Sequence, residues 1–391
     1  MCGVEDARQD RRSLGRREFV ASAGAFLIGG CASCARSDVE YSVPLLGDVH
    51  FDETEWGRYH VGWKPRDERD AAGRKREFVR NAEMWRERMP SLIAAAAACR
   101  TDKDAFIVQL GDLVQGDAGD IRTMMRFYSD AIKACRRGFG TLPFLSVAGN
   151  HDVRNGGRAA YDAFFPAFHS DELGERIDAT DFVVRCGPDA WIFADFMRPD
   201  AERLFSAIEN AADARYVFVV CHSPVTPVDN WGYYWFLFGK PEDSELRRRF
   251  RSLLMRHNVI ALCGHTHMVE LDEWISSEGR LTQLVLNSVW TSPTLAVPRK
   301  VADDPRTWGD LYVKRNASDV PEEHDGHYTS RTRNESLSLM AEYADGLVRY
   351  EKYEAAGHGR LHVSGSAVFV DFYGGDAVRP CKRFVLRQGI C

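Results

Sequence analysis

The stretch LPFLSVAGNHD at residues 142–152 passes from a short apolar run directly into a cluster of polar side chains. The run 142–148 is almost entirely apolar and rich in β-forming residues, which is typical of a strand buried on both faces of a parallel sheet. Gly-Asn-His-Asp follows at residues 149–152. Because α/β proteins place their sites at the carboxyl ends of parallel strands, this stretch predicts both the sheet and a site at its edge.

Four other apolar runs end in the same way, and helical patterns lie between several of the runs. This alternation indicates an α/β fold. The four runs are 43–47, 105–110, 216–221 and 259–263, and the helical patterns are 80–100, 121–135 and 244–257. At the strand ends stand Asp48, His50, Asp112, Asn150, His151, Asp152, His222, His265 and His267.

These strand-end side chains are three carboxylates, five histidines and one amide. Their oxygen and nitrogen donors suit Mn²⁺, Fe or Zn²⁺. Asp48 and His50 are two residues apart, as are His265 and His267, so both members of each pair can leave a strand end toward the same side. Two cations about 3.5–4 Å apart need a bridging carboxylate to offset their repulsion, and Asp112 is the natural candidate. The sequence therefore predicts a centre of two divalent metal ions.

Taken in order, these motifs resemble those of the calcineurin-like metallophosphoesterase superfamily. Asp-x-His begins at Asp48, Gly-Asp ends at Asp112, Gly-Asn-His-Asp covers 149–152, a lone histidine stands at His222, and Gly-His-x-His ends at His267. The motifs span more than half of the chain, and the ordered set of five is highly specific although each alone is weak. The resemblance implies an α/β fold of the two-sheet αββα sandwich type, here with a C-terminal β-rich extension.

The resemblance also implies a role for each strand-end residue. Asp48, His50 and His267 hold one metal, Asn150, His222 and His265 hold the other, Asp112 bridges them, His151 is general acid or transition-state stabiliser, and Asp152 orients His151. The implied mechanism is in-line attack on phosphorus by a metal-bridged hydroxide. Metal coordination provides this nucleophile because it lowers the pKa of water to around 7.

The expected function is hydrolysis of a phosphate ester, with a phosphodiester favoured. The Asp-x-His motif at Asp48 argues against the purple acid phosphatase branch, which lacks that histidine, and is closer to the class that includes bacterial cyclic-nucleotide phosphodiesterases. Gln115 is a departure, because many relatives carry a further acidic residue there. A phosphomonoesterase or nucleotidase on the same metal core is the alternative. A non-catalytic surface lipoprotein is a second alternative, which the complete ligand set disfavours.

Two further features are candidates for substrate contact. Arg154 closely follows the Gly-Asn-His-Asp motif, and it is expected either to contact a substrate phosphate or to form a surface salt bridge. The aromatic segment 226–243 leaves the site soon after His222 and predicts either a wall for the leaving group or a core strand. Its candidate contact residues are Trp231, Tyr233 and Trp235.

The formal net charge of -6 and the pI of about 6.1 argue against a protein that grips a long nucleic acid. The expected partner is a small phosphate-ester substrate. The 391 residues divide into an export signal and linker at 1–37, a metallophosphoesterase domain at 38–290, and a third part at 291–391. That third part begins as a polar excursion and ends in strand patterns at 346–353, 361–373 and 382–388, which we expect to pack on the core.

The N-terminus has the pattern of an export signal. The pair Arg16-Arg17 precedes an apolar run at 19–30 and then Cys31, a succession that resembles a twin-arginine signal with a lipobox. We expect export across a bacterial cytoplasmic membrane to a periplasmic or lipid-anchored location, with membrane contact only through an acyl group on Cys31. A frayed amphipathic helix is the alternative.

Overall fold

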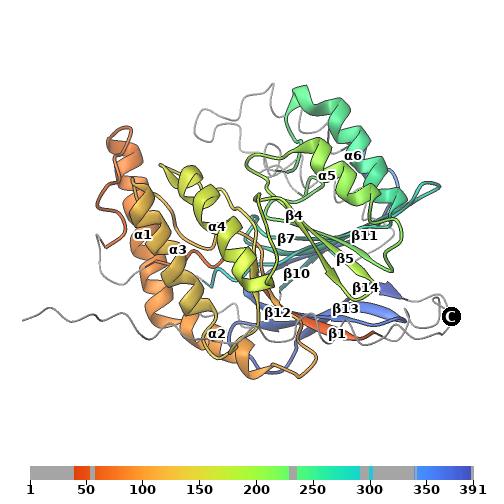
Figure 1. Ribbon diagram of the computed structural model, residues 1–391, viewed down its shortest axis with the longest axis horizontal. Helices are drawn as coiled ribbons and strands as arrows, with labels where there is room; N and C mark the ends of the chain where they lie inside the picture. The colour runs from red at the N-terminus through yellow and green to blue at the C-terminus, as the bar shows by residue number, and fades with distance from the viewer. Residues whose placement is uncertain are drawn as a thin grey trace, which may run out of the picture.

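The computed structural model describes residues 39–52, 58–228, 236–290, 299–302, 339 and 341–388. These residues form two β-sheets with helices on both outer faces (Figure 1). The predicted two-sheet αββα sandwich is therefore confirmed. The expected leader at 1–37 and the aromatic residues Trp231, Tyr233 and Trp235 lie outside the described ranges.

The first sheet has the strand order β14-β13-β12-β1-β2-β3. Its parallel strands are buried along their whole length, as their apolar runs predict, and are β1 (Tyr41–Leu46), β2 (Ile107–Gln109) and β3 (Phe144–Ser146). The C-terminal part of the chain supplies the antiparallel strands β12 (Gly357–Val363), β13 (Ala367–Gly374) and β14 (Lys382–Gln388).

The second sheet has the order β10-β11-β8-β9-β7-β6-β5-β4, with parallel pairing from β5 through β6 and β7 to β9. Its strands are β4 (Phe182–Cys186), β5 (Asp189–Ala194), β6 (Val217–Cys221), β7 (Ile260–Cys263), β8 (Val269–Ser276), β9 (Gly279–Val285), β10 (Arg299–Ala302) and β11 (Leu347–Glu354). Because β11 pairs with β8 and β12 with β1, the C-terminal segment contributes to both sheets.

Buried apolar side chains form three layers. Trp85 belongs to the layer between the first sheet and helices α1–α4, Val43 to the layer between the sheets, and Phe250 to the layer under α5 and α6. The helices are α1 (Glu68–Glu87), α2 (Met89–Ala98), α3 (Ile121–Cys135), α4 (Gly157–Leu173), α5 (Ala201–Glu209) and α6 (Ser244–Arg256), with a short 3-10 helix at Pro241–Asp243. Among the described residues, no helix is both long and apolar enough to cross a membrane.

Two elements expected from the sequence are each divided in two in the structure. The helical pattern at 80–100 is two helices that meet at Arg88, because Pro90 suits the first turn of a helix but not its interior. The expected strand at 361–373 is the end of β12 and most of β13, joined by a turn at 364–366. The Ser-Gly-Ser sequence at 364–366 favours a turn, but the apolar alternation on either side of it suggested one continuous strand.

Candidate active site

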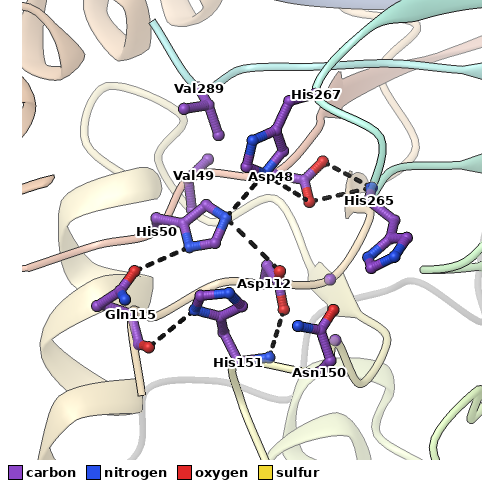
Figure 2. A network of polar contacts seen from close by, with 12 residues as sticks. Asp48, Val49, His50, Asp112, Gln115, Asn150, His151, His265, His267 and Val289 are labelled. Carbon is purple, nitrogen blue, oxygen red and sulfur yellow. Dashed lines mark hydrogen bonds and ion pairs between the residues drawn. The ribbon is translucent and has the colours of Figure 1, made fainter. Parts of the chain in front are cut away.

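The carboxyl ends of five strands from the two sheets meet at one place (Figure 2). In the first sheet, Asp48 follows β1, Asp112 follows β2, and Asn150 and His151 follow β3. In the second sheet, His222 follows β6, and His265 and His267 follow β7. The main chains of the two sheets touch here, because residue 48 forms a parallel bridge with Asn287. All the strand-end residues predicted from the sequence are brought together.

The backbone around the site is unusual. His50, Asp112, His265 and His267 have φ angles of 41°, 51°, 76° and 54°, in the left-handed region that non-glycine residues seldom adopt. Such conformations persist only where the surrounding structure enforces them, and they cluster at functional sites. Close packing adds to the constraint, since a Cβ at Gly149 would lie 2.1 Å from the Asp112 nitrogen.

One half of the site is formed by Asp48, His50 and His267. The Nε2 atoms of His50 and His267 are 3.1 Å apart, and Asp48 Oδ1 lies 3.8 Å from Nε2 of His267. Asp48 is fixed in place because both of its oxygens accept from the His265 main-chain nitrogen, at 3.0 and 2.9 Å. The ligand-type atoms of this trio all lie within 4.8 Å of one another.

The other half is formed by Asn150, His222 and His265. Nε2 of His222 lies 3.1 Å from Oδ1 of Asn150 and 3.1 Å from Nδ1 of His265. The opposite ring nitrogen of His222 faces the Leu110 carbonyl at 2.8 Å, which fixes the ring. Asp112 lies between the halves, with its Oδ2 3.5 Å from Nε2 of His50 and 3.4 Å from Nε2 of His222.

This geometry fits two metal ions. Two nitrogens that bind one cation at about 2.1 Å and at right angles lie about 3 Å apart. The pair His50–His267 and the pair His222–His265 are each separated by 3.1 Å. Donor groups around Asp112 cluster on both of its sides. The histidine and aspartate clusters are therefore suited to a dinuclear metal site with Asp112 between the two positions.

The pKa values of these groups reflect burial and close charges. Burial lowers the pKa of both His50 and His265 to about 3, so both rings are neutral, which is the form that binds metals. Burial raises the pKa of Asp48 to about 7. Burial also acts to raise the pKa of Asp112, but His222 and its other histidine neighbours outweigh it and hold that pKa well below its usual range. Burial acts to lower the pKa of His222, but the nearby Asp112 carboxylate outweighs it and raises that pKa to about 9. The same negative charge would attract a metal cation in place of the proton.

His151 faces the site, but its partner is not the expected one. Its Nδ1 lies 3.0 Å from the main-chain carbonyl of Gln115, and its main-chain nitrogen donates to Asp112 Oδ1 at 2.7 Å. Asp152 accepts instead from the main-chain nitrogens of Val114 at 3.0 Å and Gly149 at 2.9 Å. The expectation that Asp152 orients the His151 ring is therefore wrong. Asp152 connects the loop after β2 to the loop after β3 by these hydrogen bonds. The sequence does not indicate these partners, because Val114 is distant from Asp152 in the chain.

Arg154 lies beside His151 rather than on the open surface. Its Nη2 donates to the Gln115 carbonyl at 3.1 Å, forms an ion pair with Asp117 at 3.2 Å, and contacts Nδ1 of His151. Asp117 is fully buried, so this pair is not the surface salt bridge considered from the sequence. At the end of the aromatic segment, Phe236 and Phe238 belong to the buried layer under α5 and α6.

Three polar residues at the site were missed in the sequence. Asn81 and Glu77 of α1 contact the Gln115 side chain. Nothing in the sequence around them distinguishes these two polar residues from the others of the same helix. Asn287 donates to the carbonyls of His267 at 2.9 Å and Ala355 at 2.8 Å. It thereby connects the loop after β7 to the connection between β11 and β12.

Comparison with known proteins agrees with this site. The calcineurin-like phosphoesterase family matches residues 43–269, more than half of the chain. No curated protein sequence matches the chain.

Among solved structures, a purple acid phosphatase from yellow lupin seeds is similar at 10% identity and a TM-score of 0.49, over 90% of this chain and 54% of that one. The chain thus spans about half the length of the lupin protein. A dimetal phosphatase from Danio rerio is similar at 12% identity and a TM-score of 0.49, over 89% of this chain and 99% of that one. By its family match, this chain belongs to the calcineurin-like phosphoesterases.

Proposed function

We propose that this phosphoesterase cleaves a phosphodiester at the Asp112 centre. The observation that carries the proposal is the position of Asp112 Oδ2, 3.5 Å from His50 on one side and 3.4 Å from His222 on the other. One cation would be held by Asp48, His50 and His267 and the other by Asn150, His222 and His265, with Asp112 shared. Bound cations supply an acidified water and neutralise negative charge on the phosphoryl oxygens.

The protein's own groups orient the substrate and move the proton. Asp112 Oδ1 is occupied by the His151 main-chain nitrogen, which leaves Oδ2 directed toward both halves of the site. With Nδ1 donating to the Gln115 carbonyl, the neutral His151 ring has its lone pair at Nε2, and a second proton taken up there can be given to the leaving oxygen. As water adds to phosphorus, the bond from phosphorus to the leaving oxygen breaks and that oxygen takes the His151 proton.

Burial, with the Arg154 guanidinium, holds the pKa of His151 well below its usual range. A phosphate anion entering the site favours the protonated ring by opposite charge. We assign uptake of the His151 proton to the complex with bound substrate, and we keep Arg154, which contacts His151, as a candidate for contact with the same phosphate. Trp231, Tyr233 and Trp235 remain candidates, from the sequence alone, for contact with a flat leaving group.

The preference for a diester rests on the Asp48-Val-His50 motif. That motif resembles the class with bacterial cyclic-nucleotide phosphodiesterases, and the distances from His50 to His267 and Asp112 support a ligand role for this histidine. The test compares release of p-nitrophenol from mono- and bis-p-nitrophenyl phosphate with added Mn²⁺. We expect a higher kcat/KM for the bis ester. A higher kcat/KM for the monoester would indicate a phosphomonoesterase, and release from neither would indicate a protein that only binds.

We also propose export through the pair Arg16-Arg17 and acylation of Cys31. A translocase that reads paired arginines should reject the double change to lysine, so that variant should stay in the cytoplasm. Cys31→Ser should release the exported protein from membranes, because the acyl chains are its anchor. Fractionation with an immunoblot measures both. Membrane-free wild-type protein with an intact Cys31 thiol would contradict the anchor.

A further inference from the structure

Helix α1 reaches the candidate metal centre through the side chain of Gln115. Oε1 of Gln115 lies 3.1 Å from Nδ1 of His50 and also accepts from Nδ2 of Asn81. Nε2 of Gln115 donates to Oε2 of Glu77 at 3.2 Å. Both Glu77 and Asn81 lie on α1, in the part of the chain between the first two motifs.

These contacts determine where His50 carries its proton. Carboxylate oxygens accept hydrogen bonds, so the amide nitrogen of Gln115 faces Glu77. The amide oxygen then faces His50, and Nδ1 of His50 must be the donor. The lone pair of the neutral ring is left on Nε2, the atom that lies 3.1 Å from Nε2 of His267 and 3.5 Å from Asp112.

Glu77 is itself held in place by a neighbouring arginine. Nη1 of Arg74 donates to its Oε2 at 2.9 Å, and the same arginine lies 3.9 Å from the buried Asp117. Asn81 is fully buried, and its oxygen accepts from Nε of Arg80 at 3.3 Å, which directs its amide nitrogen toward Gln115. Each member of the network therefore has one orientation that satisfies its neighbours.

The main chain of Gln115 contacts the second functional histidine. Its carbonyl oxygen lies 3.0 Å from Nδ1 of His151 and accepts from Arg154 at 3.1 Å. One residue thus fixes His50 through its side chain and His151 through its backbone (Figure 2).

We propose that Glu77 and Asn81 are positioning residues of the metal centre, which act through Gln115 to keep the His50 proton on Nδ1 and its Nε2 directed at the cation. The proposal rests on the proposed function, because it takes His50 as a ligand. Groups that orient a ligating histidine typically contribute about 10- to 100-fold in metal affinity. Helix α1, which lies between the first two motifs, then contributes to the active site through these two residues.

The test uses Glu77→Gln in the full chain. A glutamine at this position can present its own amide nitrogen to Gln115, which removes one of the two contacts that keep the Gln115 oxygen toward His50 and leaves the Asn81 contact. Glu83→Gln is the matched control, because it makes the same change at an exposed position of the same helix. Asn81→Leu removes the second contact and is a further variant.

Two measurements separate positioning from a merely structural role. Nitrogen NMR of the metal-free protein should show the Nδ1–H form of His50 in the wild type and in Glu83→Gln, and a mixture in Glu77→Gln. Calorimetric titration with Mn²⁺ should show about 10-fold weaker binding at one site in Glu77→Gln, at unchanged metal-free Tm, and a larger loss in Asn81→Leu. Wild-type tautomer and affinity in both variants would overturn this inference alone. A wild-type protein that binds no Mn²⁺ would overturn the proposed function as well.

Discussion

His50 and His267 direct their Nε2 atoms at each other across 3.1 Å, although they are 217 residues apart in the chain. Burial lowers the pKa of His50 to about 3 and that of His267 to about 4, so both rings are neutral. With its proton on Nδ1, His50 turns a lone pair toward His267. A cation bound between the two nitrogens explains why two lone-pair donors face each other at this distance.

Asp112→Asn should abolish turnover and remove at least one equivalent of bound metal. Asp112 is the anion between the two halves of the site, so a neutral amide weakens the attraction for both cations. Elemental analysis and turnover of bis-p-nitrophenyl phosphate measure the two effects. The exposed Asp213→Asn is the control for the loss of one carboxylate. Full metal content with full turnover in Asp112→Asn would refute the bridging role.

His151→Ala should lower turnover by about 10²–10⁴-fold, the usual contribution of a general acid, while metal content stays near that of the wild type. The loss should be largest for alkoxide leaving groups, because nitrophenolate departs without a proton. Turnover of substrates that differ in leaving-group pKa measures this, with His257→Ala at the end of α6 as control. An equal loss for all leaving groups would argue against the acid role.

Asp152→Asn should lower the free energy of unfolding more clearly than it lowers turnover. Its two oxygens accept from Val114 and Gly149, so an amide leaves one of these buried nitrogens facing another donor. An unsatisfied buried group costs about 1–3 kcal/mol, and the free energy of unfolding should fall by that amount. Urea denaturation measures it. Unchanged stability together with the leaving-group pattern of His151→Ala would restore the orienting role that the structure contradicts.

His169 should make the protein less stable as the pH falls below about 6.5. Burial lowers the pKa of His169 to about 3, so between these values the unfolded chain binds a proton that the folded chain does not. His169→Gln keeps an acceptor for the Ser146 nitrogen, now 3.2 Å from the ring, but does not titrate.

The wild type should therefore lose roughly 1.4 kcal/mol per pH unit more than His169→Gln below that value. Urea denaturation in steps from about pH 7 to about pH 5 measures the two slopes. Equal slopes would show that His169 is not held neutral by the fold.

Much of the candidate site was predictable from the sequence because the information is local. Asp112 follows an apolar run and a glycine. Such a run predicts a buried strand, and polar residues that follow it are expected at the carboxyl edge of the sheet. The same reasoning places His222 and His265 without knowledge of any contact between them.

What the sequence could not provide depends on contacts between distant segments. The partner of His151 is a main-chain carbonyl, which any residue type would offer, so the identity of Gln115 carries no signal for it. The link from Asn81 to Gln115 needs the packing of α1 against the first sheet. The alternation in the C-terminal strands indicates strands but not their partners, so the pairing of β12 with β1 was not predicted.

Metal removal followed by titration tests whether turnover depends on two bound cations. Protein stripped with a chelator is mixed with increasing Mn²⁺, and bound metal and hydrolysis of bis-p-nitrophenyl phosphate are measured in the same samples. We expect no turnover in stripped protein and full turnover at two bound equivalents per chain, since one cation leaves the Asp112 bridge incomplete. Undiminished turnover by protein that holds no measurable metal would contradict this expectation.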